Sequence, residues 1–318
     1  MTDRGIYSFS EIQTNSGIVQ YRTENLTGIK CRISPERIKR NIDNPDFSKY
    51  NNEPCPFCPE NVLINTPVFK DGTRIQKGES ITFPNLFPFA RKHVVTVITK
   101  DHNVRTFSKK QIEDAIDGQY RALINETGYS SINWNFLPSA GASMLHPHMQ
   151  GISDYTPSNL TEKYITNSYK YYQEKGKNYW DELIHTEMKS SRFIAGSEII
   201  WAANPVPLGE KEIRGYMPFS TLDELESYID LISKGMKNII DFYNYLGHYA
   251  FNFSLYTGTP KNKNKGFRAF CSFIARINPN RACTSDTAFM ERLHMEPVIL
   301  TLPEDLGEAY SNFKINTK

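Results

Sequence analysis

Hydrophobic and polar residues alternate along the chain in a pattern that predicts a helix followed by a strand. Residues 108–111 match a capping box, in which a serine and a glutamine close the first turn of a helix. Apolar residues then continue at helical spacing to about residue 125. Residues 131–136 alternate between polar and apolar side chains, which is typical of a strand with one buried face. A loop of small residues and another strand follow.

The same order recurs in the second half of the chain. Residues 221–224 form another capping box, an amphipathic helix is predicted to follow, and residues 249–256 alternate like a strand. A loop of small residues and a strand at 267–277 complete this copy. We interpret the pattern as an internal duplication with repeats at 1–157 and 158–318. Each repeat is expected to be α+β, with a mainly antiparallel sheet and a long helix packed on it.

Shorter patterns predict the remaining elements. Further strands are expected at 17–21, 28–33, 81–87, 93–99, 193–201 and 211–217. Helices are expected within 158–190, which is rich in aromatic residues, and at 303–313. An aromatic stripe of this kind more often reflects packing than a ligand site.

One strand of the first repeat concentrates the chemistry. After the small residues of 141–143, the chain continues with His146, Pro147, His148 and Gln150. Alternate residues of a strand share a face, so both histidines and the glutamine are predicted to form one row. Pro147 lacks an N–H donor, so the strand is expected to be an edge strand or irregular at that residue.

Four residues are candidates for a metal site. Cys55 and Cys58 form a Cys-x-x-Cys motif among prolines, and His102 and His146 complete a Cys2His2 set that suits tetrahedral Zn²⁺. Four protein ligands leave no open position, so this zinc would be structural. A redox pair and plain packing are the alternatives for the cysteines, and a surface position is the alternative for His102.

His148 remains free in this scheme and is the candidate nucleophile. An imidazole nitrogen can attack phosphorus and divide one transfer into two displacements. Gln150 can donate to a phosphate oxygen, and Ser143 with nearby main-chain amides can do the same. The alternatives are that His148 is another metal ligand or a hydrogen-bonded core histidine.

Composition narrows the class of protein. A net charge of +2 argues against a dedicated nucleic-acid or membrane-surface protein, and no apolar run approaches membrane-spanning length. Five cysteines without framework spacing indicate reduced thiols and a cytoplasmic protein. The basic segment 32–40 is either a solvated surface or an arginine clamp for a substrate phosphate.

Together these motifs resemble the galactose-1-phosphate uridylyltransferase and ADP-glucose phosphorylase branch of the histidine-triad superfamily. The resemblance rests on Cys-Pro-Phe-Cys-Pro-Glu-Asn at 55–61, Lys-Asp-His at 100–102 and the small-residue loop with His-Pro-His-x-Gln at 141–150. It implies two histidine-triad repeats and a zinc site.

By position, the resemblance implies a role for each matching residue. His148 becomes nucleotidylated, Gln150 marks the transferases and Ser143 contacts phosphate. Asn85 lies at the nucleotide, and Cys55, Cys58, His102 and His146 bind structural zinc. Arg37 and Arg40 lie near substrate phosphates. The sequence departs from the family at Met144, Leu145 and Met149. The second repeat lacks the histidines of a further metal site, and the glutamate that would join them after the His-Pro-His strand is also missing.

These observations predict a nucleotidyltransferase. It would move a nucleoside monophosphate from a nucleotide sugar to a sugar 1-phosphate or phosphate through a covalent intermediate on His148. The alternatives are a hydrolase of nucleotide sugars or dinucleotides, and a zinc-stabilised nucleotide-binding protein without catalysis. A homodimer is what the family suggests.

Overall fold

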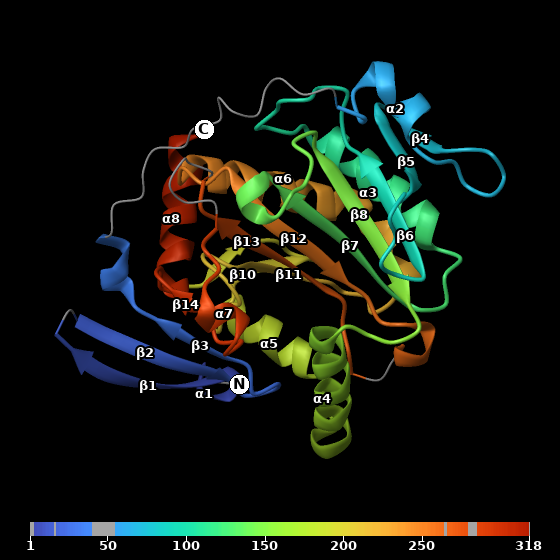
Figure 1. The fold of residues 1–318 in the computed structure, drawn as a ribbon. Helices are drawn as coiled ribbons and strands as arrows, with labels where there is room; N and C mark the ends of the chain where they lie inside the picture. The colour runs from blue at the N-terminus through green and yellow to red at the C-terminus, as the bar shows by residue number, and fades with distance from the viewer. Residues whose placement is uncertain (1–2, 16, 40–54, 264–265, 279–284, 318) are drawn as a thin grey trace.

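A ten-stranded antiparallel sheet forms the centre of the molecule (Figure 1). The computed structural model describes residues 3–15, 17–39, 55–263, 266–278 and 285–317. The order of the strands is β4-β5-β6-β8-β7-β12-β13-β11-β10-β9, so five strands of the first half meet five of the second where β7 pairs with β12. From one edge to the other the strands are β4 (Ile75–Lys77), β5 (Ser80–Pro84), β6 (Lys92–Val97), β8 (His148–Asp154), β7 (Tyr129–Phe136), β12 (Ala250–Tyr256), β13 (Phe270–Arg276), β11 (Ile213–Tyr216), β10 (Ile200–Ala203) and β9 (Phe193–Ala195).

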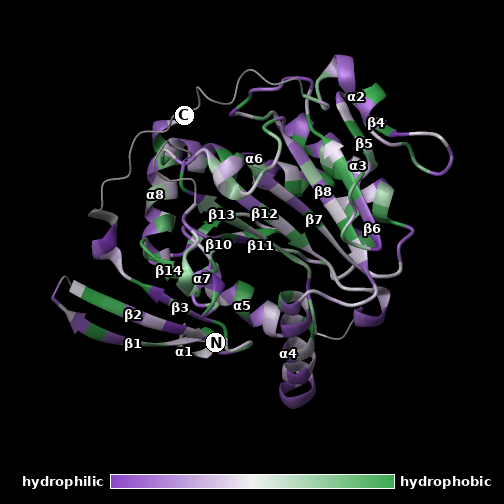
Figure 2. Cartoon of the chain, viewed as in Figure 1, coloured by the Kyte–Doolittle hydropathy of each residue, from purple (hydrophilic) through white to green (hydrophobic). Residues whose placement is uncertain are grey.

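Two long helices, α3 (Lys109–Leu123) and α6 (Ile229–Tyr245), lie side by side on one face of this sheet. Their apolar sides share one large core with the inward residues of the central strands, such as Trp134 and Phe253. Figure 2 shows hydrophobic residues gathered on these strands and on the helices that cover them. The C-terminal helix α8 (Pro303–Asn316) packs into the same core beside β9 and β10.

The opposite face of the second half is covered by a different layer. Helices α4 (Asn159–Lys175) and α5 (Tyr179–Glu187) contribute Tyr164 and Trp180 to a second core. A four-stranded sheet of β1 (Tyr7–Thr14), β2 (Gly17–Glu24), β3 (Lys30–Ile33) and β14 (Val298–Ile299) closes this core. Most of α4 is hydrophilic in Figure 2, and it projects from the body of the molecule.

Short elements complete the described part of the chain. The α-helical ones are α1 (Asp3–Ile6), α2 (Pro59–Asn65) and α7 (Phe289–Arg292). The 3-10 helices are η1 (Pro35–Lys39), η3 (Pro138–Ala140), η4 (Leu222–Tyr228) and η5 (Pro260–Asn262). Among them, α2 lies over the first half, on the face of the sheet that α3 leaves free, where its Val62 contacts Phe83, Val95 and Val97.

The structure confirms the predicted α+β class and corrects details of the strands. The prediction of a single strand at 193–201 is wrong, because a turn at Gly196, with φ of 116°, divides this segment into β9 and β10. The strand of the histidines is not an edge strand, since β8 pairs with β6 and β7 on its two sides. It begins only at His148, directly after Pro147, so the predicted irregularity at this proline is present.

The division into repeats at 1–157 and 158–318 stays a prediction. The central sheet runs across the proposed boundary without interruption. In addition, the N-terminal strands pair with β14 and pack against the second half. Within the described segments, no helix has both the length and the apolar character required to cross a bilayer.

Candidate active site and metal centre

Strand β8 presents different residues to the two faces of the sheet. Met149 is fully buried in the core beneath α3, and the Cβ position of Gly151 points at Gln119 and Leu123 of that helix. Side chains alternate along a strand, so His148 and Gln150 lie on the opposite face. This face therefore carries the predicted site residues His148 and Gln150.

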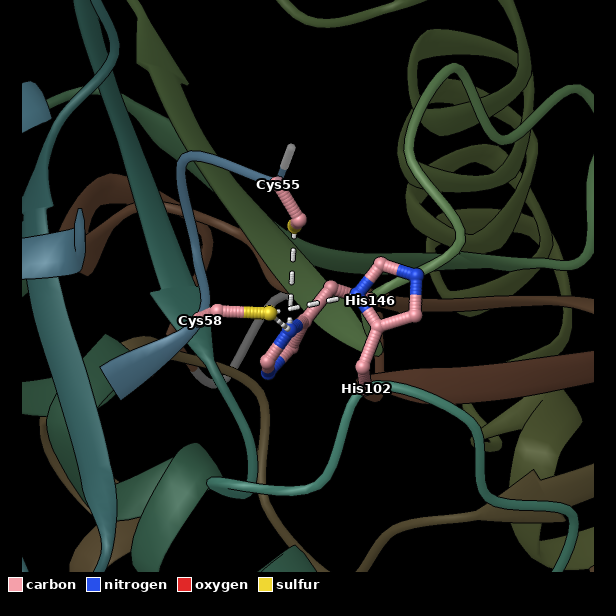
Figure 3. Close-up of side chains that lie close together, drawn as sticks. All are labelled: Cys55, Cys58, His102 and His146. Atoms are coloured by element: carbon pink, nitrogen blue, oxygen red, sulfur yellow. Dashed lines mark hydrogen bonds between the residues drawn. The ribbon is translucent and has the colours of Figure 1, made fainter. Parts of the chain in front are cut away.

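Two thiols and two imidazoles converge beside the start of β8 (Figure 3). Cys55 precedes the turn into α2, Cys58 is the residue before its first turn, and Pro59 begins the helix with the fixed φ that suits this position. His102 follows β6, and His146 precedes β8. The four candidate ligand atoms all lie within 4.8 Å of one another.

The spacing of these atoms fits a tetrahedral metal ion. Nδ1 of His146 lies 3.8 Å from Sγ of Cys55 and 3.7 Å from Sγ of Cys58, and Nδ1 of His102 lies 3.4 Å from Sγ of Cys58. Tetrahedral Zn²⁺ with ordinary Zn–S and Zn–N lengths would separate such pairs by about 3.6 Å. The predicted set of four ligands is thus brought together as a group that could hold a metal ion.

The ring of His146 is oriented by its other nitrogen. Nε2 donates to the main-chain carbonyl of Thr99 at 2.8 Å, which leaves the lone pair of Nδ1 directed at the thiols. Burial lowers the pKa of His146, so its ring is neutral, as a metal ligand must be. Burial and the neighbouring Cys55 raise the pKa of the Cys58 thiol to about 11, so this thiol is protonated at neutral pH unless a cation stabilises the thiolate.

His148 is oriented in the opposite way. Its Nδ1 donates to the main-chain carbonyl of His146 at 2.9 Å, so the lone pair of the neutral ring lies on Nε2. Burial lowers the pKa of His148 and favours this neutral form. Phe57, between the two cysteines, contacts the ring edge-on, with centroids 5.4 Å apart. Among the described residues, Nε2 has no hydrogen-bond partner, so its lone pair is available to a ligand.

Gln150 has a partner that the sequence did not reveal. His93 of β6 is only 4% exposed, and its Nε2 lies 2.9 Å from Oε1 of Gln150 and 3.1 Å from Nδ2 of Asn85. Residue 93 appeared in the sequence only as the start of a β-branched strand. The register that pairs Val95 with Gln150 is what brings His93 to this face. The sequence offered a single signal: His93 lies two residues before Val95 in the same predicted strand, so the two side chains share a face.

The predicted phosphate-contacting serine lies in a tight loop. Leu137 leaves β7 with φ of 71°, a left-handed conformation that is uncommon for residues other than glycine. Its carbonyl accepts the main-chain N–H groups of Ala140 and Ala142, at 3.0 and 3.3 Å. Ser143 follows and is exposed, so its hydroxyl is accessible to a ligand.

Of the predicted arginine clamp, Arg37 is not brought to this face. Arg37 is exposed on η1, which follows β3 and contacts β2 of the N-terminal sheet. In Figure 1 this segment lies far from α2, on the other side of the molecule. Arg40 lies outside the described residues. The roles of both arginines remain predictions.

The corresponding face of the second half carries no such group among the described residues. Ser272 of β13 pairs with Arg214 of β11, much as His148 pairs with Val97 of β6. Its hydroxyl donates to Glu212 at 2.7 Å in a buried ionic cluster. Next to it, the rings of Tyr256 and Phe270 stack with centroids 4.9 Å apart. This half is therefore filled by its own side chains under α4 and α5.

Comparison with known proteins identifies the fold. No family model matches the sequence. An uncharacterized protein of Archaeoglobus fulgidus is 23% identical over 315 residues, which cover 93% of this chain and 92% of the relative.

Solved structures give a closer view of the architecture. An ADP-glucose phosphorylase from Arabidopsis thaliana with bound ADP-glucose superposes with a TM-score of 0.71 at 17% identity, over 92% of this chain and 98% of that one. A GalT-like protein from the same plant has a TM-score of 0.68 at 16% identity, over 91% and 97%. A uridylyltransferase has a TM-score of 0.67 at 14% identity, over 91% and 96%. The chain therefore has the fold of the galactose-1-phosphate uridylyltransferase and ADP-glucose phosphorylase proteins, as the motifs of the sequence predicted.

Proposed function

We propose that this protein is a nucleotidyltransferase that uses His148 as its nucleophile. The donor is a nucleotide sugar, and the acceptor is phosphate or a sugar 1-phosphate, which places the reaction in carbohydrate metabolism. The ADP-glucose phosphorylase and the uridylyltransferase of the same fold are named for reactions of this class.

One observation carries the proposal, namely the hydrogen bond from Nδ1 of His148 to the carbonyl of His146, at 2.9 Å. It fixes the tautomer that leaves the lone pair of Nε2 free, and burial keeps the ring neutral. A neutral, oriented imidazole is the form that attacks phosphorus. Gln150, on the same face of β8, provides an amide that cannot titrate.

The reaction then proceeds as two displacements. In the first, the Nε2 lone pair attacks the α-phosphorus of the nucleotide sugar and forms an N–P bond. The P–O bond to the β-phosphate breaks, and its electron pair leaves with the sugar 1-phosphate. In the second, an oxygen of the acceptor attacks the same phosphorus, and the N–P electron pair returns to Nε2. In this proposal, Gln150 and Ser143 donate hydrogen bonds to the oxygens of the transferred phosphoryl group.

We further propose that Cys55, Cys58, His102 and His146 hold a structural Zn²⁺. Two soft thiolates and two imidazoles at tetrahedral spacing favour zinc over harder oxygen-seeking cations. A bound ion would restrain the side chain of His146, whose main-chain carbonyl orients His148. All further chemistry belongs to the protein side chains, because four protein ligands leave no open position.

Half-reaction kinetics test the function. Purified protein is mixed with a panel of nucleotide sugars without acceptor, and the released sugar 1-phosphate is measured. The proposal predicts a burst equal to about one molecule per chain, followed by turnover only when phosphate or a sugar phosphate is added. Steady-state data with both substrates should give the parallel lines of a ping-pong mechanism.

The other outcomes separate the alternative functions. Continued release of nucleoside monophosphate without acceptor would indicate the hydrolase. Saturable nucleotide binding without any burst would indicate the binding protein that lacks catalysis.

Two predictions accompany the proposal, pairing into a homodimer and a cytoplasmic location. Light scattering after size-exclusion chromatography tests the first, and imaging of the tagged protein in its own cells tests the second.

A further inference from the structure

Among the described residues next to His148 and Gln150, one buried histidine has no role in the proposed function. His93 lies on the same face of the sheet, from the neighbouring strand β6, and 4% of it is exposed. Unlike His146, it is outside the cluster that could hold a metal ion. Phe89 covers its ring edge-on, with centroids 4.3 Å apart. A buried imidazole needs a polar partner, and in the part of the chain that the structure describes the side chains within hydrogen-bonding distance are those of Gln150 and Asn85.

The two partners compete for one ring nitrogen. Nε2 of His93 lies 2.9 Å from Oε1 of Gln150 and 3.1 Å from Nδ2 of Asn85. In a neutral imidazole Nε2 either donates or accepts, so it can satisfy only one of them. The main-chain N–H of Phe89 donates to Nδ1 at 3.4 Å, which makes Nδ1 the acceptor and leaves the hydrogen on Nε2. This tautomer donates to Gln150.

The consequence for Gln150 is a fixed amide orientation. Because its oxygen accepts from His93, its NH₂ group points away from His93 and can donate to a substrate oxygen. A flipped amide would present its oxygen, which repels the negative oxygens of a phosphate. Burial lowers the pKa of His93 and favours the neutral ring, in which Nδ1 can accept from the N–H of Phe89.

Asn85 is left with a free donor by the same arrangement. Its Oδ1 accepts the main-chain N–H of Phe87 at 2.8 Å, so the atom that lies 3.1 Å from Nε2 of His93 is its amide nitrogen, which is a donor. Since Nε2 of His93 is committed to Gln150, the Asn85 amide is available to an acceptor on the nucleotide.

We propose that His93 is a positioning residue that holds the Gln150 amide with its N–H donors toward the transferred phosphoryl group. This inference rests on the proposed function and deepens it, because it explains how an amide, which is otherwise free to flip, becomes a directed donor. His93 itself does not touch the substrate.

Single-turnover kinetics on four variants test the inference. Formation and discharge of the nucleotidylated protein are followed by rapid quench and intact mass in His93→Ala, His93→Gln, Gln150→Ala and the double variant His93→Ala/Gln150→Ala. His93→Ala should slow both half-reactions about tenfold or more, and Gln150→Ala should slow them by about 10² to 10³. The double variant should be no slower than Gln150→Ala, because His93 acts only through Gln150. Donor affinity should stay within about twofold.

Conservative variants separate positioning from packing. The amide nitrogen of a glutamine can occupy the place of Nε2, so His93→Gln should regain most of the rate. The shorter side chain of an asparagine places its amide nitrogen only near the position of Nδ1. The half-reactions of His93→Asn should therefore stay slow. Val95→Ala, which removes apolar volume from the same face of β6, serves as the control and should lower stability but leave the half-reactions unchanged. If His93→Ala does not fold, the comparison of Gln with Asn gives the same test.

Two results would overturn the inference. One is a rate for His93→Ala equal to that of the parent. The other is that His93→Ala lowers the rate of the half-reactions by the same factor in the parent protein as in the Gln150→Ala background. That result would indicate a purely structural role for His93. A parent protein that forms no adduct with any donor would instead overturn the proposed function, and this inference with it.

Discussion

Nδ1 of His148 lies 2.9 Å from the main-chain oxygen of His146, and the ring of His146 in turn contributes to the Cys2His2 cluster. The side chain of His146 thus lies in a group that could hold a metal ion, and its main-chain carbonyl orients the ring of His148, the proposed nucleophile. The two histidines of the His-Pro-His motif have different surroundings: His146 lies in the cluster, whereas Nε2 of His148 has no hydrogen-bond partner among the described residues. Pro147 separates them at the point where β8 begins.

Loss of a cluster thiol should remove the metal and weaken both the fold and the reaction. We expect Cys55→Ser to bind less than one tenth of the zinc of the parent and to lose at least about 2 kcal/mol of unfolding free energy. Elemental analysis and urea unfolding measure these two quantities. Cys31→Ser is the matched control, since Cys31 is also buried but belongs to the N-terminal sheet. Full zinc content in Cys55→Ser would contradict the assignment.

Gln150 should act in the transition state rather than in binding. Replacement by alanine is expected to lower the rate of transfer by about 10² to 10³, with little change in donor affinity, because a directed donor to a developing negative charge is lost. Rapid-quench measurements give the rate of transfer, and equilibrium binding gives the affinity for the donor, so the two effects are measured separately. Gln119→Ala removes a buried glutamine from the helix side of the sheet, where it donates to Thr96 at 2.8 Å. That variant should keep the parent rate, and a similar loss of rate in both variants would argue against a specific role.

Stability should fall in acid because of Glu304. Its carboxylate accepts from Arg22 at 2.9 Å through both oxygens and from Arg192 at 3.1 Å. Burial opposes ionisation, but hydrogen bonds and charge from Arg22, with the charge of Arg192, hold the pKa of Glu304 below its ordinary value. A lowered pKa in the folded state means that this contribution is full above the unfolded pKa and is lost as the pH falls through the folded pKa.

Urea unfolding between pH 3 and pH 7 measures this linkage. The parent should lose stability below about pH 4.5, the ordinary range of a glutamate. Glu304→Gln should be less stable than the parent at neutral pH and should show a shallower fall in acid. Parallel curves for the two proteins would show that Glu304 does not contribute to the acid dependence.

Local signals in the sequence predicted the long helices α3 and α6, whereas the short helix α2 next to the cysteines was not predicted. The capping box at Ser108 is present, with the N–H of Gln111 donating to the serine oxygen at 3.1 Å and the N–H of Ser108 donating back to the glutamine side chain at 2.9 Å. Such contacts lie within one turn, so residue types alone indicate them. The Cys2His2 set was also predictable, because zinc ligands restrict residue type and spacing more strongly than most sites do.

Relationships that depend on strand register were not predictable in the same way. His93 becomes a neighbour of Gln150 only through the antiparallel pairing of β6 with β8, which no short stretch of sequence encodes. The break at Gly196 was missed because apolar residues on both sides of it continue the pattern of a single strand. Strand β1 was not predicted either, since six of its eight residues are exposed and it lacks a buried alternating face.

The distance of Arg37 from the His148 face illustrates a further limit. A motif in the sequence indicates that residues act on one kind of ligand, but it does not place the segment in space. Here η1 continues from the N-terminal sheet, which packs on the second half of the molecule. The chemical suitability of an arginine for phosphate therefore says nothing about whether the fold brings it to the phosphate.

The central claim is that His148 carries the nucleoside monophosphate, and intact-protein mass spectrometry tests it most directly. The parent and His148→Ala are incubated with a panel of nucleotide sugars at neutral pH without acceptor, after confirming that both are folded and contain zinc. We predict a gain of one nucleoside monophosphate in the parent, its removal when phosphate or a sugar 1-phosphate is added, and no gain in His148→Ala. The same adduct in His148→Ala, or no adduct in a parent that binds the nucleotide sugar, would contradict the account.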